Sequence, residues 1–508
     1  MLSALIWLPA FGVLLISLYP AGRGEARVFR WIALGITGLT FLLTLWLGLQ
    51  FDASSANLQF QEDLPWLDAL GLTYRLGVDG LSFPLILLNS LLTWIAIFST
   101  DQNLTRPRLY YLLILLLHTG VAGAFLSQNL LLFFLFYELE LVPLYFLIAI
   151  WGGAKRGYAA TKFLIYTAVS GILLLVGFLG LTWLSGASSF AYDVTLSPGL
   201  PITTQIVLLS LLLVGFGIKI PLVPFHTWLP DAHVEASTPV SVLLAGVLLK
   251  LGTYGLLRFG LGLFPEAWAV LSPWLATWAV VSILYGALTA IAQTDMKKMV
   301  AYSSIGHMGF ILLAAAAATP ISLLGALFQM ISHGLISALL FLLVGVVYRK
   351  TGTRDMTLLK GLLSPERGLP LIGSLMIVGV MASAGIPGMM GFISEFLIFR
   401  GSFPGFPVQT LLAMVGTGLT AVYFLLLVNR SFFGRLPDQF ANLPAVSWQE
   451  RLPGFSLACM IILLGLQPNW LVHWTERATT ALGPSETTIV EVLHSTPNTA
   501  LNRLKGSG

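Results

Sequence analysis

A small set of ionisable residues interrupts the long apolar runs of this chain. Lys219 and Lys250 each lie in a stretch long enough to cross a bilayer. A lysine near the middle of a membrane helix costs about 2.5–3.5 kcal/mol on insertion scales, so such a residue usually faces a partner or a hydrated interior. The ionisable positions expected inside the membrane are Glu138, Glu140, Lys219, Lys250, His307, His333 and Glu395. Titratable groups of this kind, bridged by water, can pass a proton from one to the next, so the pattern predicts a proton path.

Two of these residues lie beside expected helix breaks. Pro221 and Pro224 follow Lys219, and proline removes a backbone donor and clashes with the carbonyl one turn back. The segment Gly385-Ile386-Pro387-Gly388 precedes Glu395 in the same way. A broken membrane helix is tolerated only where it lines protein or water, so charges beside breaks are typical of an ion or proton site.

Several candidate residues of the proton path have alternative explanations. Glu138 and Glu140 are two residues apart and point about 200° apart on a continuous helix, so we favour Glu138 as the functional carboxylate. His226 and His233 flank a polar turn, where capping of broken backbone is as good an explanation as proton relay. Lys250 can also snorkel towards a helix end. A buried histidine can be merely hydrogen-bonded between helices, and Glu395 can pair with a nearby arginine.

Composition indicates an all-α polytopic membrane protein. The chain has 508 residues, of which 57% are hydrophobic and 9% charged, whereas soluble domains carry about 25% charged residues. Cys459 is the single cysteine, which excludes a cysteine-ligated iron–sulfur cluster or a disulfide framework within this chain. There is no HExxH, Walker or dinucleotide motif. We therefore expect no cofactor or metal in this chain, electron transfer in other polypeptides, lipid contacts and no nucleic-acid partner.

The apolar runs predict about fourteen transmembrane helices, with breaks in helices 7 and 12 and an acidic loop after the second. The expected spans are 2–20, 31–50, 81–99, 109–127, 130–151, 161–185, 204–222, 238–262, 270–292, 298–318, 321–348, 370–400, 407–430 and 453–474. With this count, eighteen of the 26 lysines and arginines fall on one side and six on the other. The positive-inside rule makes the basic side cytoplasmic, so both termini are expected on the opposite side. The first run reads as a retained helix rather than a signal peptide.

The two breaks lie five spans apart, and a five-helix unit repeated in tandem is inverted because five is odd. We therefore expect two inverted five-helix repeats. The predicted organisation is N-terminal helices 1–3 in residues 1–100, a first repeat (helices 4–8) in 109–262, a second, inverted repeat (helices 9–13) in 270–430, and a connecting loop, helix 14 and a tail in 431–508.

Several segments resemble the antiporter-like subunits of complex I. These are YELELVPLYFLIAIWG (137–152), GIKIPLVPFHTWLPDAH (217–233), LLAGVLLKLGTYGLLR (243–258), AYSSIGHMGF (301–310), SHGLISALLFL (332–342) and GIPGMMGFISEF (385–396). The sequence is most similar to the M-type subunits, or chain 4, which have a glutamate in span 12 where relatives have lysine. The resemblance implies a fourteen-helix fold with inverted repeats at spans 4–8 and 9–13. It also implies a proton path through Glu138, Lys219, Lys250, His307, His333 and Glu395.

The ELEL and WGGAKR segments resemble the D-type subunits of the photosynthetic complex I of cyanobacteria and chloroplasts. This resemblance implies a thylakoid membrane with lumenal termini, neighbouring antiporter-like subunits as partners, and plastoquinone and iron–sulfur clusters in partner subunits. It leaves open whether the complex is a carbon-dioxide-uptake form. Two other functions remain open at this point: a subunit of a multisubunit cation/proton antiporter, and a structural membrane scaffold with paired buried charges.

Overall fold

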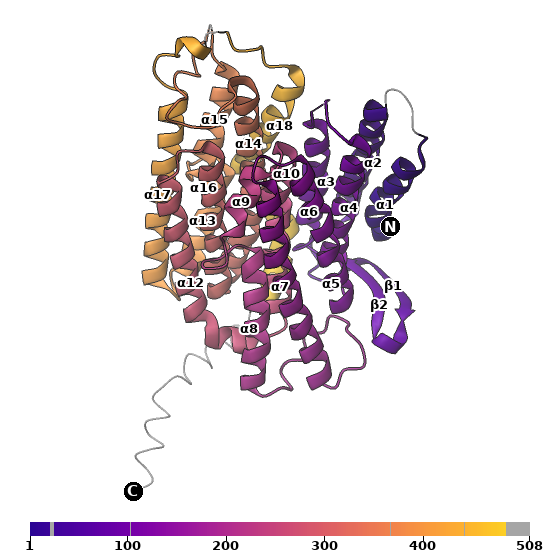
Figure 1. Cartoon of the computed structure of the whole chain (residues 1–508). Helices are drawn as coiled ribbons and strands as arrows, with labels where there is room; N and C mark the ends of the chain where they lie inside the picture. Colours follow the sequence, from indigo (N-terminus) through magenta and orange to yellow (C-terminus); the bar gives the residue numbers. More distant parts are fainter. Residues whose placement is uncertain (21–24, 102, 366, 441, 484–508) are drawn as a thin grey trace.

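Apolar helices dominate the computed structural model, which describes residues 1–20, 25–101, 103–365, 367–440 and 442–483. Most of the helices run roughly along one axis and form a single bundle, with a small hairpin beside α1 and α5 (Figure 1). The first elements are α1 (Leu2–Leu18), α2 (Glu25–Gln50), β1 (Gln59–Leu67), η1 (Asp68–Leu70), β2 (Leu72–Val78), α3 (Phe83–Phe98), α4 (Pro107–Leu126), α5 (Leu130–Leu139), α6 (Leu141–Trp151) and α7 (Arg156–Leu184). The middle elements are α8 (Ile202–Lys219), α9 (Trp228–Glu235), α10 (Thr238–Leu243), η2 (Leu244–Leu248), α11 (Leu249–Gly255), η3 (Leu256–Leu261), α12 (Pro265–Ile291), α13 (Met296–Ala317) and α14 (Pro320–Thr351). The last are α15 (Pro370–Ser383), α16 (Met390–Ser402), α17 (Pro407–Ser431), η4 (Asp438–Phe440), α18 (Trp448–Leu466) and α19 (Asn469–Leu482).

The described residues contain eleven helices that are long and apolar enough to span a membrane, counting α5–α6 and α10–η3 as one helix each. Three shorter apolar helices, α1, α3 and α15, accompany them. The predicted all-α polytopic membrane class is thereby confirmed. The number fourteen, the inverted repeats and the domain boundaries stay predictions.

Both predicted interruptions are present. α8 ends at Lys219 and α9 begins at Trp228, because Pro221 and Pro224 lack the N–H groups that would continue the helix. α15 ends at Ser383 and α16 begins at Met390. Between them Gly385 and Gly388 have φ values of +71° and +89°, a left-handed conformation that glycine adopts without steric cost.

The segment after α2 differs from its prediction as an acidic loop. β1 and β2 pair as an antiparallel hairpin in which Asp63 lies opposite Arg75. The Arg75 Nε and Asp63 Oδ2 atoms are 3.7 Å apart at the surface. No residue of β1 is buried, so its sequence has no apolar–polar alternation, and a polar loop and a hairpin look alike there.

The predicted single span 453–474 is wrong, because two helices occupy this region. α18 ends at Leu466 and α19 begins at Asn469. Pro468 stands at the junction and has no N–H to donate back to the α18 carbonyls.

α12 and α13 pack with their backbones in direct contact. A Cβ atom on Gly286 would lie 2.7 Å from the backbone nitrogen of Gly306. A Cβ atom on Gly309 would lie 2.9 Å from the carbonyl oxygen of Ala279. Glycine at these positions therefore permits an approach that any larger residue would prevent.

Candidate functional site

Lys219 is the last residue of α8, where the chain breaks inside the bundle. A cation is favourable at this position because the carbonyl groups at a helix C-terminus carry partial negative charge. Side chains satisfy the backbone groups that the break leaves free. Val223 N–H donates to Ser282 Oγ of α12 at 3.2 Å, and Trp228 Nε1 donates to the Ile218 carbonyl at 2.8 Å. Side chains from α12 and from α9 thus stabilise the backbone at the break.

Lys219 forms an ion pair with Glu140, and their side chains are 1% and 0% exposed. The sequence analysis favoured Glu138, not Glu140, as the functional carboxylate. α5 ends at Leu139 and α6 begins at Leu141, but Glu140 between them keeps a helical backbone, with φ −74° and ψ −22°. The two carboxylates therefore still point in different directions, and the helix rotation alone does not decide which of them faces α8.

Glu138 lies close by on the α7 side. It is half-buried, and its carboxylate occupies the space that a side chain on Gly171 would need. The ring of Tyr137 approaches Lys219, with 4.5 Å between its centroid and the lysine Nζ. Glu138, Glu140 and Lys219 are called the Lys219 group below.

Lys250 belongs to a second group of buried titratable residues. It lies in α11, between the π-helical segments η2 and η3. Its Nζ donates to the Ala245 carbonyl in η2 at 2.6 Å and is 2.7 Å from His333 Nδ1 of α14. π-Helical turns are rare in proteins as a whole. Those that do occur are frequently found at functional sites, because they re-aim side chains on an otherwise regular helix.

His333 leads on to His307 and Glu395. The ring centroids of His333 and His307 are 5.6 Å apart, and His307 Nδ1 is 4.0 Å from Glu395 Oε1. Thr417 of α17 donates from Oγ1 to Glu395 Oε2 at 2.8 Å. All three titratable side chains are almost fully buried. Four side chains therefore form a row across four helices: Lys250 in α11, His333 in α14, His307 in α13 and Glu395 in α16. This row is called the Lys250 group.

A small cavity lies within the Lys250 group. Its volume is about 10 Å³, close to the smallest volume that holds one water molecule. Its lining includes His307, Gln329, Ser332, His333, Ile336, Ala382, Ser383, Gly391 and Glu395. Ser383, at the end of α15, has its Oγ 2.9 Å from His307 Nε2, and Gln329 Nε2 is 3.1 Å from His307 Nδ1. The end of α15 thus supplies a polar contact to the histidine.

No hydrogen bond or ion pair within the described part of the chain joins the Lys219 group to the Lys250 group. Their helices nevertheless touch, since a Cβ on Gly252 would lie 3.3 Å from the Lys219 Cβ. The two lysines point apart: Lys219 towards the α5–α6 junction and Lys250 towards α14. Any exchange between the groups therefore needs water or a side-chain rearrangement.

His226 and His233 lie outside both groups. The His233 ring stacks on Phe341 with centroids 4.5 Å apart, and neither of its nitrogens has a hydrogen-bond partner among the described residues. The His226 ring packs 4.7 Å from that of Tyr285. Asp231, between them, bonds instead to Lys162 at 2.7 Å. The His233 side chain therefore caps no backbone group in the described structure.

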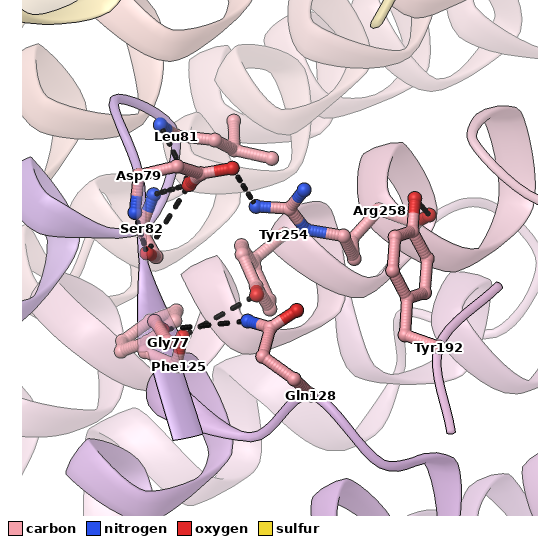
Figure 2. Close-up of polar contacts among 9 residues, drawn as sticks. All are labelled: Gly77, Asp79, Leu81, Ser82, Phe125, Gln128, Tyr192, Tyr254 and Arg258. Carbon is pink, nitrogen blue, oxygen red and sulfur yellow. Dashed lines mark hydrogen bonds and ion pairs between the residues drawn. The ribbon is translucent and has the colours of Figure 1, made fainter. Parts of the chain in front are cut away.

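Sequence reasoning missed a buried ion pair between Asp79 and Arg258, whose side chains are 5% and 7% exposed (Figure 2). Asp79 Oδ1 accepts from the backbone N–H of Leu81 and Ser82, at 3.1 and 3.0 Å, just before α3. Arg258 lies in η3, 5.6 Å from the ring centroid of Tyr254. The VDGLS segment carries the sequence signal, since an aspartate just before an apolar run is a common helix cap.

In the described residues no group of three or more His, Cys, Asp or Glu side chains has the arrangement of a metal site. What the two groups offer is a set of titratable side chains that contact one another in a bundle interior. Such groups can bind and release protons, and with water between them can hand protons on.

Comparisons with known proteins match most of this chain. The family described as NADH:quinone oxidoreductase/Mrp antiporter, TM, matches residues 127–420, which include both groups. A curated relative from Thermosynechococcus vestitus, NAD(P)H-quinone oxidoreductase chain 4 2, is 43% identical over 95% of this chain and 91% of its own. Chain 4 of the NAD(P)H-quinone oxidoreductase of Synechococcus sp. is 41% identical over 99% of this chain and 92% of its own.

Solved structures show the same fold. A chain of respiratory complex I from Thermus thermophilus with bound NADH superposes with a TM-score of 0.85 and 27% identity, covering 95% of this chain and 99% of that chain. A chain of the Mrp complex from Dietzia sp. gives a TM-score of 0.84 at 21% identity, covering 97% and 99%. The second likeness concerns the fold alone.

Proposed function

The chain belongs to the family of membrane subunits shared by NADH:quinone oxidoreductases and Mrp antiporters, and from this premise we propose that it translocates protons as chain 4 of a complex I-type quinone oxidoreductase. It is a multi-pass integral membrane protein. Electron transfer from a reduced donor to a quinone takes place in other subunits of the complex, and this chain takes part in the enzyme as its translocating component.

The observation that carries the proposal is the row of neighbouring side chains Lys250–His333–His307–Glu395. Lysine and histidine are within hydrogen-bond distance, the two rings are neighbours, and the second ring faces the carboxylate. Placing four titratable groups in contact inside an apolar bundle is costly, and such residues usually mark proton relays. A structural scaffold has no need for a row that extends across four helices.

The Lys219 group is proposed as a second proton-binding station. Glu140 neutralises Lys219 in the described arrangement, and Glu138 lies beside it with its carboxylate half-buried. Movement of one carboxylate relative to the lysine changes how strongly the lysine holds its proton, because an opposite charge favours the charged form. His226 and His233 are proposed as minor members of the path, on the side of the α8–α9 break.

The cellular setting is also a proposal. Relatives from cyanobacteria favour the thylakoid membrane, with lumenal termini, neighbouring antiporter-like subunits, and plastoquinone and iron–sulfur clusters in partner subunits. The Mrp likeness is at 21% identity and concerns the fold, whereas identities above 40% over most of the chain favour the quinone oxidoreductase.

The test is proton translocation by the assembled complex in sealed vesicles, followed by quenching of a pH-sensitive dye while electron transfer is measured in parallel. Lys250→Ala should leave the complex assembled and abolish most of the quenching per electron transferred. Normal quenching by Lys250→Ala at equal amounts of complex would refute the proposed role. Purification without quinone-reducing subunits, but with cation-exchange activity, would favour the antiporter.

A further inference from the structure

A groove of about 1080 Å³ opens on the side of the bundle, outside both titratable groups. The groove lies along α2. This helix is at the outer edge of the bundle, next to α3 and α4 (Figure 1). α2 is the least buried of the eleven long apolar helices in the described residues. The residues that line the groove include Ala26, Arg27, Arg30, Trp31, Leu34, Gly35, Gly38, Leu39, Leu42, Trp94, Phe98, Asn103, Tyr111 and Gln449.

One end of the groove is cationic. Arg27 is exposed, and Arg30 donates from Nη2 to the Phe98 carbonyl at 2.6 Å, while its Nε is buried without a hydrogen-bond partner in the described chain. Neither arginine forms an ion pair within the described chain, and none of the described residues that line the groove is acidic, although the Asp101 carboxylate lies near Tyr111. Asn103 and Gln449 add polar side chains. This end therefore offers two guanidinium groups to an anion.

The remainder of the groove is an apolar trough. A Cβ on Gly35 would meet no atom within 4 Å, and one on Gly38 would lie 3.3 Å from the Trp94 indole nitrogen. Leu39 and Leu42 are exposed along the same helix. From Arg30 to Leu42 the helix rises about 18 Å, at ~1.5 Å per residue. One leaflet of a bilayer has a hydrocarbon depth of about 15 Å, so the trough has the length of one leaflet.

We propose that this groove binds one anionic membrane lipid. Its phosphate lies at Arg27 and Arg30, and an acyl chain follows the trough past Gly35 and Gly38. Arginine suits this role because its planar guanidinium donates two parallel hydrogen bonds to phosphate oxygens. The arginines also lie on the side that the charge distribution makes cytoplasmic, where basic pockets between membrane helices bind anionic headgroups. The lipid site stands independently of the proton path.

The test compares lipids retained by the purified, assembled complex. In native mass spectrometry with lipid extraction, R27Q/R30Q should lose one anionic lipid per complex. R430Q/R435Q removes two exposed arginines from the same predicted side and should lose none. Gly35→Phe, whose Cβ would meet no atom within 4 Å, places a bulky ring in the trough and should also lose the lipid. This variant blocks the site without changing its charge.

Binding itself is measured by adding phosphatidylglycerol or phosphatidylcholine to delipidated complex and recording thermal unfolding. Phosphatidylglycerol should stabilise the unaltered complex, and phosphatidylcholine should not. R27Q/R30Q should need a ~10-fold higher phosphatidylglycerol concentration for the same stabilisation. Unchanged lipid content in both R27Q/R30Q and Gly35→Phe would overturn the proposal. So would a map of the complex with a neighbouring subunit's helix seated in the groove.

Discussion

Lys219 at the end of α8 and Glu140 at the α5–α6 junction form an ion pair from which water is almost completely excluded. The second oxygen of Glu140, Oε2, is buried and has no hydrogen-bond partner among the described residues. The charge of each residue in the pair is therefore neutralised by the other residue. Removing one partner of a buried pair costs about 3–5 kcal/mol, because the other charge stays behind in an apolar surrounding.

Glu140→Gln should consequently impair proton translocation more than Glu138→Gln, which reverses the order expected from the sequence. The Glu140→Gln substitution leaves Lys219 without its direct partner, whereas Glu138 is half-buried and forms no ion pair in the described structure. Dye quenching per electron transferred should fall at least tenfold in Glu140→Gln and in Lys219→Ala. A larger defect in Glu138→Gln would show that Glu138 is the working carboxylate.

His333→Ala should separate Lys250 from His307 and interrupt the row. We expect loss of most proton translocation with the complex still assembled, measured by dye quenching and by subunit content. The matched control is His118→Gln, which changes a histidine that is equally buried in α4 and bonds to Thr93 at 3.0 Å, outside the row. Equal defects in both variants would indicate a packing effect rather than an interrupted path.

Asp79→Asn and Arg258→Met should each destabilise the protein by about 3–5 kcal/mol, because each leaves a buried charge unpaired. The double variant should lose less than the sum of the two. Thermal unfolding of the purified complex provides the measurement. The exposed pair of Arg75 and Asp63, with side chains 36% and 59% exposed, is the control and should contribute about 0–1 kcal/mol. Additive losses at Asp79 and Arg258 would contradict direct coupling.

The charge distribution predicts that the segment after α14 is cytoplasmic and the β1–β2 hairpin is on the opposite side. In a Cys459→Ser background, a cysteine replacing the exposed Leu358 should react with an impermeant reagent only from the cytoplasmic face. A cysteine replacing the exposed Leu70 should react only from the other face. The reverse labelling pattern would invert the assigned orientation.

The sequence identifies the titratable residues well because a charge in an apolar run stands out and is costly. It also locates the breaks after Lys219 and before Glu395, since proline and glycine act on their own backbone. It does not identify partners. The choice between Glu138 and Glu140 depended on which face of their helix packs against α8, and Asp79 meets Arg258 across 179 positions of chain. Such contacts arise from packing of distant helices, which local periodicity does not encode.

The backbone contact between α12 and α13 has a mechanical consequence. At Gly286 against Gly306 and at Gly309 against Ala279, the backbones of these helices meet so closely that they cannot slide past each other without a clash. We therefore expect the two helices to move as a unit. Trp278 and Ser282 of α12 bond to Val223 in the α8–α9 break, and His307 lies on α13. A displacement of this helix pair would thus act on the Lys219 break and on the Lys250 group together.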